Sequence, residues 1–551
     1  MVEFGVDPDV IVVGAGHNGL VCAAYLARAG LNVLLVEARS SVGGCASTVE
    51  AVGGRVNICN CDHLAVRTLP LIEELDLARH GLSYLDLDLT MVAQSYSAQL
   101  PGAAERPFLQ FHDVERTLAS LRVSLPDQAE GYRRFVHAAL PVARLVTDLA
   151  AHPAGPRGAL STLTGRRRAG LATWTGRPGA GLATLLRWSR LSAAQVLRQF
   201  FTSETILGAA VAGGPAVWGV SPHTPGTGLG ALRLVLPHAV QPGRPLGGSG
   251  ALTDALRASF EAAGGTVATD TRVARLLVEG HRVVGVRTTT GQAWRAKAVV
   301  VACDPRAAIL EWLQQPPSGV GSFVEQWRAR PDPLGYESKL DATITELPRY
   351  RQLDERLLAA VGVSATEAVG ATNFITPSLD AIASAHRALQ RHQMVEHPIL
   401  LANIASVGDP SMLSPSGAHV LSLEVLFTPY GLAGGWPGSP EPRRWLELYA
   451  AQTQSEGDFL ARVQQWRAMT PDRYEAEFFM PRGYAQSFAG GPLAALVGRD
   501  PELTRYRTPI DGLFLTGAAT FPGAGVWGAS GRNAAGVVVD SLDVTGRAVR
   551  R

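Results

Sequence analysis

Residues 10–19 read Val-Ile-Val-Val-Gly-Ala-Gly-His-Asn-Gly, and they are the strongest indication of the fold. A short β-branched run leads into the pattern Gly-x-Gly-x-x-Gly, and residues 20–29, which are rich in small side chains, predict a helix. A second apolar run at 33–36 ends directly before Glu37. Strand, turn, helix, strand and acid in this order predict a β-α-β unit that binds a dinucleotide.

Each position of this motif has a physical role. Gly14 permits the tight turn, Gly16 lets the backbone approach a diphosphate, and Gly19 lets the helix pack closely on the sheet. The N–H groups at the start of the helix favour the negative charge of the diphosphate. Glu37 is placed to accept hydrogen bonds from ribose hydroxyls, and its charge disfavours the additional phosphate of NADP.

Three further features favour FAD over NAD. Arg39 and the pair Gly43-Gly44 follow the acidic residue closely. The chain closes with a strand at 513–516, a loop of small residues, and a helix from 530 to 541. These two regions lie at opposite ends of the chain, as if both held one long ligand. We expect backbone N–H groups near Val526 and Trp527 to stabilise the negative charge of a reduced flavin.

These segments resemble the phytoene-dehydrogenase-related FAD-dependent oxidoreductases, a group of carotenoid desaturases and isomerases with non-carotenoid relatives. The resemblance rests on 12–19 with Glu37, on 42–48, on 246–304 and on 512–536. It implies an α/β fold in which a Rossmann-type FAD-binding domain is assembled from discontinuous segments, beside a mixed sheet-plus-helix substrate domain. The expected parts are an FAD-binding domain at 1–100, 246–305 and 501–551, a helical substrate region at 101–245, and a substrate domain at 306–500.

The resemblance also implies a set of cofactor-binding residues. Val273 stands where the family offers a backbone contact to the adenine. Cys45 follows Gly43-Gly44 where carotenoid enzymes often have arginine, and Phe521 stands where many members have a histidine before Pro-Gly. Both departures weaken a carotenoid assignment. The implied cofactor-binding residues are Gly14, Gly16, Asn18, Gly19, Glu37, Ala38, Arg39, Gly44, Cys45, Val273, Gly517, Gly525, Val526 and Asn533.

Few residues suggest themselves for the chemical step, because hydride transfer to flavin N5 needs orientation and exclusion of water more than a reactive side chain. We expect residues 57–63 to pass near the flavin, and His63 is a candidate for moving a proton near neutral pH. A structural histidine is the other interpretation. Trp527 is a candidate for the substrate wall, with core packing as its alternative. His223 and His238 are further candidates for lining a substrate tunnel.

The sequence therefore predicts an FAD-dependent oxidoreductase, whether dehydrogenase, desaturase or isomerase, that transfers hydride from an apolar or partly apolar organic substrate to flavin N5. The apolar substrate follows from the resemblance, and the electron acceptor is open between oxygen, a quinone and another compound. One alternative is an FAD-dependent oxidase of amine or peptide-like metabolites. Another is a flavin-binding scaffold or regulatory protein with little turnover.

The amino-acid composition bears on other classes of function and on the location of the protein. Apolar residues make up 46% of the 551 residues, and the net charge is +2, so we expect a large core and no nucleic-acid binding. Five cysteines without a C-x-x-C predict neither a disulfide framework nor a metal site, and they favour the cytoplasm. We expect no signal peptide. Residues 149–203 hold eight arginines and no acid, which predicts a solvated basic face or a peripheral contact with a membrane or partner.

Overall fold

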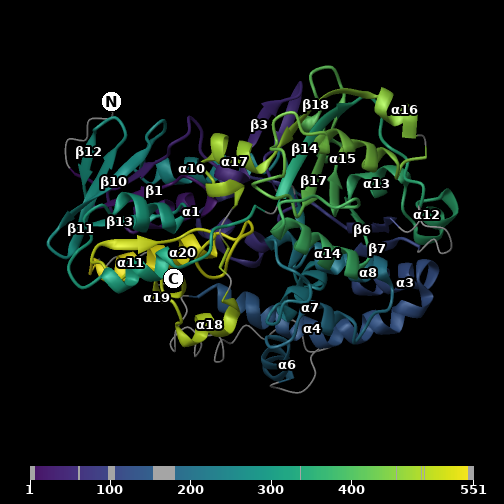
Figure 1. Ribbon diagram of the computed structural model, residues 1–551, viewed down its shortest axis with the longest axis horizontal. Coiled ribbons are helices and arrows are strands. Elements are labelled where there is room, and N and C mark those ends of the chain that lie inside the picture. The colour runs from purple at the N-terminus through teal and green to yellow at the C-terminus, as the bar shows by residue number, and fades with distance from the viewer. Residues whose placement is uncertain are drawn as a thin grey trace.

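The computed structural model describes residues 7–59, 62–96, 106–152, 180–335, 337–454, 456–484, 487–488 and 490–543. Its strands divide mainly between two large sheets, one in each half of the molecule (Figure 1). Residues 153–179, which carry Arg157, Arg166, Arg167, Arg168 and Arg177 of the expected basic face, lie outside the described residues.

The first half is built on a five-stranded parallel sheet in the order β19-β13-β1-β2-β9. The strands are buried along nearly their whole length, as expected for a parallel sheet that is covered on both faces. Segments from the start, the middle and the end of the chain thus form one sheet, which confirms a Rossmann-type domain assembled from discontinuous parts. The strands are β1 (Val10–Val13), β2 (Val33–Val36), β9 (Thr266–Ala268), β13 (Ala298–Val301) and β19 (Leu513–Leu515).

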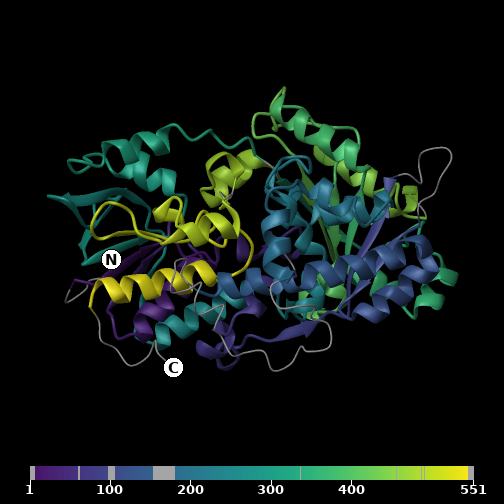
Figure 2. The same cartoon turned by 90° about the horizontal axis from the view of Figure 1, so that it is seen from below.

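Three helices, α1 (His17–Arg28), α10 (Gly250–Ala262) and α20 (Ala529–Ser541), cover one face of this sheet. Figure 2 shows α20, in yellow, beside the purple N-terminal segments. The contact between α1 and α20 is very close, since a Cβ atom at Gly531 would lie 2.2 Å from the carbonyl oxygen of Asn18. The two ends of the chain are therefore locked together through backbone.

The opposite face is covered by a small antiparallel sheet and by α11 (Gly321–Arg328). Residues 266–279 form two strands, β9 and β10, which belong to different sheets. The chain turns between them because the N–H groups of Asp270 and Thr271 donate to the carbonyls of Arg39 and Glu37. The small sheet consists of β10 (Val273–Glu279), β11 (Arg282–Thr288) and β12 (Ala293–Arg295).

The second half is built on a seven-stranded sheet in the order β18-β14-β17-β16-β15-β6-β7. Neighbouring strands are antiparallel except β15 and β6. The strand at 89–95, which the sequence placed in the first FAD-binding segment, is part of this sheet. Its strands are β6 (Leu89–Ser95), β7 (Phe108–Phe111), β14 (Glu337–Ile344), β15 (Thr372–Thr376), β16 (Leu400–Asn403), β17 (His419–Leu426) and β18 (Val463–Met469).

Helices cover both faces of the large sheet and form two apolar cores with it. One layer holds α3 (Val114–Ser124), α4 (Ala129–Ala150), α7 (Ala193–Leu197), α8 (Glu204–Ala212) and α14 (Leu379–Gln390). The other holds α12 (Glu355–Val361), α13 (Ala365–Gly370) and α15 (Glu441–Ala450). Within the described ranges, none of the helices combines the length and the apolar character needed to cross a bilayer.

Candidate active site

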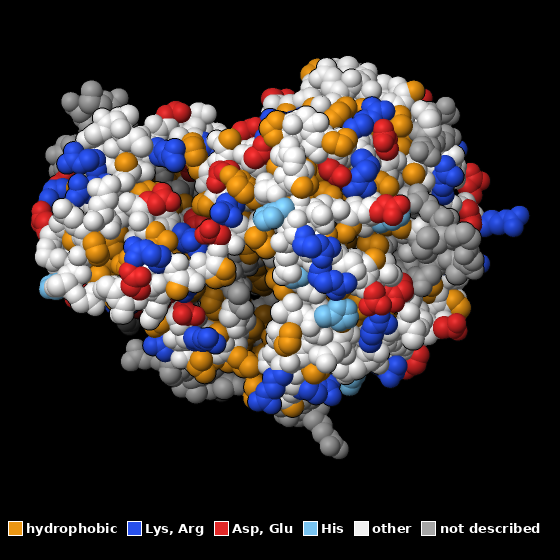
Figure 3. Space-filling model, in the orientation of Figure 1, with side chains coloured by type: hydrophobic (Ala, Val, Ile, Leu, Met, Phe, Trp, Pro, Cys, Tyr) orange, Lys and Arg blue, Asp and Glu red, His pale blue; other side chains and the backbone are white. Residues whose placement is uncertain are grey.

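A cavity of about 1230 Å³ lies between the two halves and is lined by residues of both. The surface is visibly hollowed between them (Figure 3). Most of the sequence-predicted cofactor residues line one end of this cavity, which we call the dinucleotide cradle. They are Gly14, Gly16, Asn18, Glu37, Ala38, Arg39, Gly44, Cys45, Val273, Gly517, Gly525 and Val526, joined by Trp527.

The fingerprint turn has the predicted geometry. Gly14 has a φ of +101°, and a Cβ atom at Gly19 would lie 1.9 Å from the Gly14 carbonyl oxygen. Gly19 thus packs α1 on the turn and does not line the cavity. No side chain caps the N-terminus of α1, while Gly16, His17 and Asn18 line the cavity. The free N–H groups of this helix end suit a diphosphate.

Glu37 is held at the edge of the cradle by backbone. Its two carboxylate oxygens accept hydrogen bonds from the N–H groups of Ala15, at 2.7 Å, and Arg39, at 2.9 Å. The Arg39 guanidinium lies 4.1 Å from the centre of the Phe478 ring. These contacts fix the direction of a carboxylate that has further lone pairs for ribose hydroxyls.

The closing segment meets the fingerprint directly. Burial lowers the pKa of His17 to about 4, and a hydrogen bond to the backbone of Gly525 opposes this shift. The Ser530 hydroxyl, to which no sequence motif pointed, accepts a hydrogen bond from the Gly517 N–H at 3.0 Å and so shapes the loop. The N–H of Trp527 donates to the Gly525 carbonyl at 3.0 Å. Of the two N–H groups expected to face a flavin, that of Trp527 is therefore already used.

Several polar atoms at the cradle lack hydrogen-bond partners among the described residues. The Oδ1 atom of Asn18, Nη1 of Arg39 and Oδ2 of Asp304 are buried and make no hydrogen bond in the described structure. All three residues line the cavity. Buried polar atoms are nearly always satisfied in native proteins. The cradle therefore fits a ligand with many donors and acceptors, as FAD has.

His63, the predicted proton-transfer residue, does not line the cavity. Its ring is fully buried, with Nδ1 3.0 Å from the Tyr84 hydroxyl and Nε2 3.2 Å from the Ser249 hydroxyl. Burial lowers its pKa to about 3. The structure therefore supports the interpretation of His63 as a structural histidine. It does not support a role for His63 in proton transfer. The segment does pass the cavity, but through Cys59 and Asp62.

Three other candidates also lie away from the cavity. Asn533 donates to the carbonyl of Ala150 at 3.0 Å and thus ties α20 to α4. His238 bonds the Tyr132 hydroxyl at 2.7 Å, and His223 lies near Asp380. Their side chains contribute to packing or to the surface, so neither a cofactor contact by the Asn533 side chain nor a tunnel formed by the two histidines has support.

The far end of the cavity, which we call the substrate arm, was not foreseen. It lies between the seven-stranded sheet and the helical layer, and its lining combines apolar residues with a few polar groups from the sheet. The apolar residues include Ala209, Ala210, Val217, Trp218, Leu232, Leu234, Phe374 and Leu401, and the polar ones include Asp62, Thr372, Asn403, Glu337 and Glu424.

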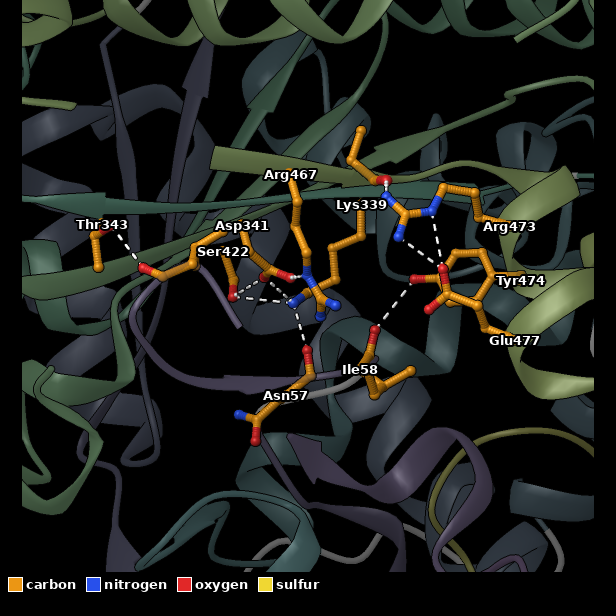
Figure 4. A network of polar contacts seen from close by, with 12 residues as sticks. Asn57, Ile58, Lys339, Asp341, Thr343, Ser422, Arg467, Arg473, Tyr474 and Glu477 are labelled. Carbon is orange, nitrogen blue, oxygen red and sulfur yellow. Dashed lines mark hydrogen bonds and ion pairs between the residues drawn. The ribbon is translucent and has the colours of Figure 1, made fainter. Parts of the chain in front are cut away.

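A buried ionic network underlies this sheet face (Figure 4). Lys339 donates to Asp341, to the carbonyl of Asn57 and to the Ser422 hydroxyl, and Arg467 donates to Asp341 at 3.1 Å. Lys339 and Asp341 are at most 1% exposed. Because the two charges are paired and further hydrogen-bonded, the network avoids the cost of isolated buried ions.

Glu424 stands opposite Lys339 in the register of β17 and β14, and it faces the cavity. Burial raises the pKa of Glu424 to about 7, although the positive charge of Lys339 opposes the shift. The signal for this site was present in the sequence. In 337–344 the polar residues Glu337, Lys339, Asp341 and Thr343 alternate with mostly apolar ones, which is the pattern of a strand with one polar face.

Comparison with known families places two domains on the chain. The NAD(P)-binding Rossmann-like domain matches residues 12–71, and the FAD dependent oxidoreductase domain matches residues 247–404. In the described ranges, no group of His, Cys, Asp and Glu has the arrangement of a metal site.

Full-length relatives and solved structures agree with this result. The chain is 30% identical over 580 residues to pyridine nucleotide-disulfide oxidoreductase domain-containing protein 2 of Rattus norvegicus, covering 97% of this chain and 94% of that protein. It is 25% identical to one of the subunits of limonene dehydrogenase from Castellaniella defragrans, covering 97% and 95%. Cyclohexylamine oxidase from Brevibacterium oxydans shares the fold with a TM-score of 0.55 and 17% identity, covering 98% of this chain and 100% of that one.

Proposed function

Because this chain belongs to the phytoene-dehydrogenase-related family of FAD-dependent oxidoreductases, we propose that it removes a hydride from carbon in an apolar or partly apolar organic substrate. One observation carries this proposal. A single cavity joins the dinucleotide cradle to an arm with a largely apolar lining. A substrate in the arm would thus reach the ring end of a dinucleotide held in the cradle.

The cradle residues hold the cofactor in this proposal. Glu37 accepts hydrogen bonds from ribose, the N-terminus of α1 binds the diphosphate, and Val273 offers its backbone to the adenine. When bound, FAD supplies an acceptor for two electrons and a proton, while the protein supplies orientation and exclusion of water. Trp527 and Trp218 line the cavity beside Gly525 and form the wall at this point.

The arm selects the substrate by shape and polarity. Its walls come from α8, from the turn at 228–234 and from β15 and β16, and apolar side chains on all of them exclude water from the reacting carbon. The relative from Castellaniella defragrans is named as part of a limonene dehydrogenase. Limonene is a hydrocarbon, which supports an apolar substrate for this chain as well.

Glu424 is the proposed proton acceptor. Its carboxyl group faces the cavity and has a pKa of about 7, so both protonation states are populated near neutral pH. Loss of a hydride from one carbon and of a proton from its neighbour forms a double bond. The Glu424 carboxylate takes that proton at an oxygen atom of its side chain.

Anaerobic mixing of the FAD-loaded protein with terpenes, polyenes, long-chain organic acids and alkyl amines tests the proposal. We expect an apolar hydrocarbon or a related compound to bleach the visible flavin absorption. Bleaching by amines alone would favour an amine oxidase, and no bleaching by any compound would favour a flavin-binding scaffold. Reoxidation of the bleached protein by oxygen or by a quinone then identifies the electron acceptor.

A further inference from the structure

Arg233 brings a positive charge into the substrate arm. It lies in η7, a 3-10 turn (Gly228–Leu234), and its neighbours Leu232 and Leu234 are buried and line the same cavity. The Arg233 side chain is itself exposed. A cation between two buried leucines of the arm needs a physical explanation.

The exposed surface of Arg233 faces the cavity. A Cβ atom placed on Gly213, directly after α8, would lie 3.3 Å from Cγ of Arg233 and 3.5 Å from Cε1 of Phe374. The stem of Arg233 is therefore packed between the helical layer and the sheet. Burial lowers the pKa of its guanidinium below the ordinary value, and the charge of Asp62 opposes this shift. An exposed side chain whose charge is nevertheless desolvated projects into an interior space and not into bulk water.

Arg233 has no partner in the part of the chain that the structure describes, where it forms neither a hydrogen bond nor an ion pair. Asp62, the acid whose charge acts on it, already lies 2.7 Å from Nη2 of Arg244 and accepts a hydrogen bond from Thr372. The other buried cations near the arm, Lys339 and Arg467, are both paired with Asp341. A desolvated cation without an anion is costly.

We propose that Arg233 binds the carboxylate group of the substrate, which is then an organic acid with an apolar body. A guanidinium group matches a planar carboxylate with two parallel hydrogen bonds, and one such group balances one negative charge. Leu232, Leu234 and Phe374 fit the carbon skeleton beside it. This inference rests on the proposed function, because it assumes that the arm holds the substrate.

Binding of simple probes to the FAD-loaded wild-type protein tests the inference. Octanoate, octanamide and octylamine share one carbon chain and differ in head group. Calorimetry is expected to show octanoate binding at least tenfold more tightly than octanamide, and octylamine more weakly than either. Equal affinity for acid and amide, or a preference for the amine, overturns the inference.

Variants localise the effect. Arg233→Met keeps the length of the side chain and removes its charge, and we expect at least a tenfold loss of octanoate affinity with octanamide unchanged. Arg233→Lys retains part of the preference for the acid. The control is Arg198→Met, which removes an exposed arginine that pairs with Glu204 outside the cavity lining. Unchanged octanoate binding in Arg233→Met overturns the inference. If that variant loses FAD, the preference of the wild-type protein for octanoate over octanamide is the test.

The two proposals fail in different ways. If no compound bleaches the flavin but octanoate binds through Arg233, the proposed function is wrong and the anion site stands. If substrates bleach the flavin while acid and amide bind alike, the function stands and the role of Arg233 is wrong.

Discussion

The dinucleotide cradle and the substrate arm share one cavity, but they are built from different materials. The cradle is made of backbone and small residues in short motifs, such as 14–19 and 517–528. The arm is made of side chains that project from strands and helices scattered over the chain. A site formed by backbone depends on close approach, whereas a site formed by side chains depends on balancing their charges.

The cradle and the arm also differ in how their buried polar atoms are paired. Among the described residues, Asn18, Arg39 and Asp304 at the cradle have buried polar atoms without a hydrogen-bond partner, which a large polar ligand would satisfy. The sheet beneath the arm pairs its buried charges internally, through Lys339 and Asp341. Removing a buried charge should therefore destabilise the arm more than the cradle. Adding a methyl group should destabilise the cradle more than the arm.

The largest effect is expected from Lys339→Met. It leaves Asp341 buried with one cation fewer, and losing one partner of a buried pair costs about 3–5 kcal/mol in the free energy of unfolding. Denaturation by urea measures this loss. The control is Lys297→Met, since Lys297 is 68% exposed and pairs with Asp9 at the surface, where such pairs contribute less than about 1 kcal/mol. Similar losses of unfolding free energy in the two variants would show that the buried ion pair contributes no more than the surface pair.

A smaller but more local effect is expected from Gly531→Ala. The added Cβ atom would meet the Asn18 carbonyl oxygen and force α20 away from α1, at a cost of about 1–3 kcal/mol and with weaker retention of FAD. Gly536→Ala is the matched control on the same helix, because no atom of the described residues lies within 4 Å of its Cβ position. That variant should stabilise the protein by up to about 1 kcal/mol. Equal melting temperatures would show that the close approach is unimportant.

His63 predicts an acid sensitivity of the folded state. Its pKa of about 3 in the folded protein lies below the ordinary 6.5, so the unfolded chain binds the proton more readily. Stability therefore falls as the pH drops from 6.5 towards 3, by up to about 1.4 kcal/mol per pH unit for this group. His17 and His238 act in the same direction. In His63→Gln the free energy of unfolding should change less steeply with pH, by that amount. Urea titrations at pH 6.5, 5.5 and 4.5 measure this slope, and identical slopes in the wild type and the variant would show that His63 is not responsible.

The smallest effect concerns the rate of flavin bleaching by substrate. If Glu424 takes a proton, the wild-type rate rises as the pH increases through about 7, where its carboxyl group ionises. Glu424→Gln should lose this step while its rate at low pH changes less than tenfold. Stopped-flow measurements between pH 6 and 8 provide the check, and persistence of the step in the variant would assign it to another group.

Much of the cradle could be predicted because its determinants are local. Gly14, Gly19 and Glu37 are separated by short stretches, and their spacing together with the apolar runs around them predicts a strand, a turn and a helix. The closing loop was also found, although the sequence did not show that Trp527 uses its N–H within the loop. His63 was misplaced because sequence order brings residues 57–63 to the cavity but does not say which side chains point into it.

A dinucleotide-binding fold assembled from both ends of the chain, and the class of its cofactor, could be inferred from the amino-acid sequence, since these depend on glycine positions and on strand and helix periodicity over a few residues. Which charges are paired follows from the folded arrangement alone. Whether Arg233, Glu424 or Lys339 meets an opposite charge depends on strand register and on packing between distant segments. Electrostatic pairing is a property of distance in space, and distance along the chain does not fix it.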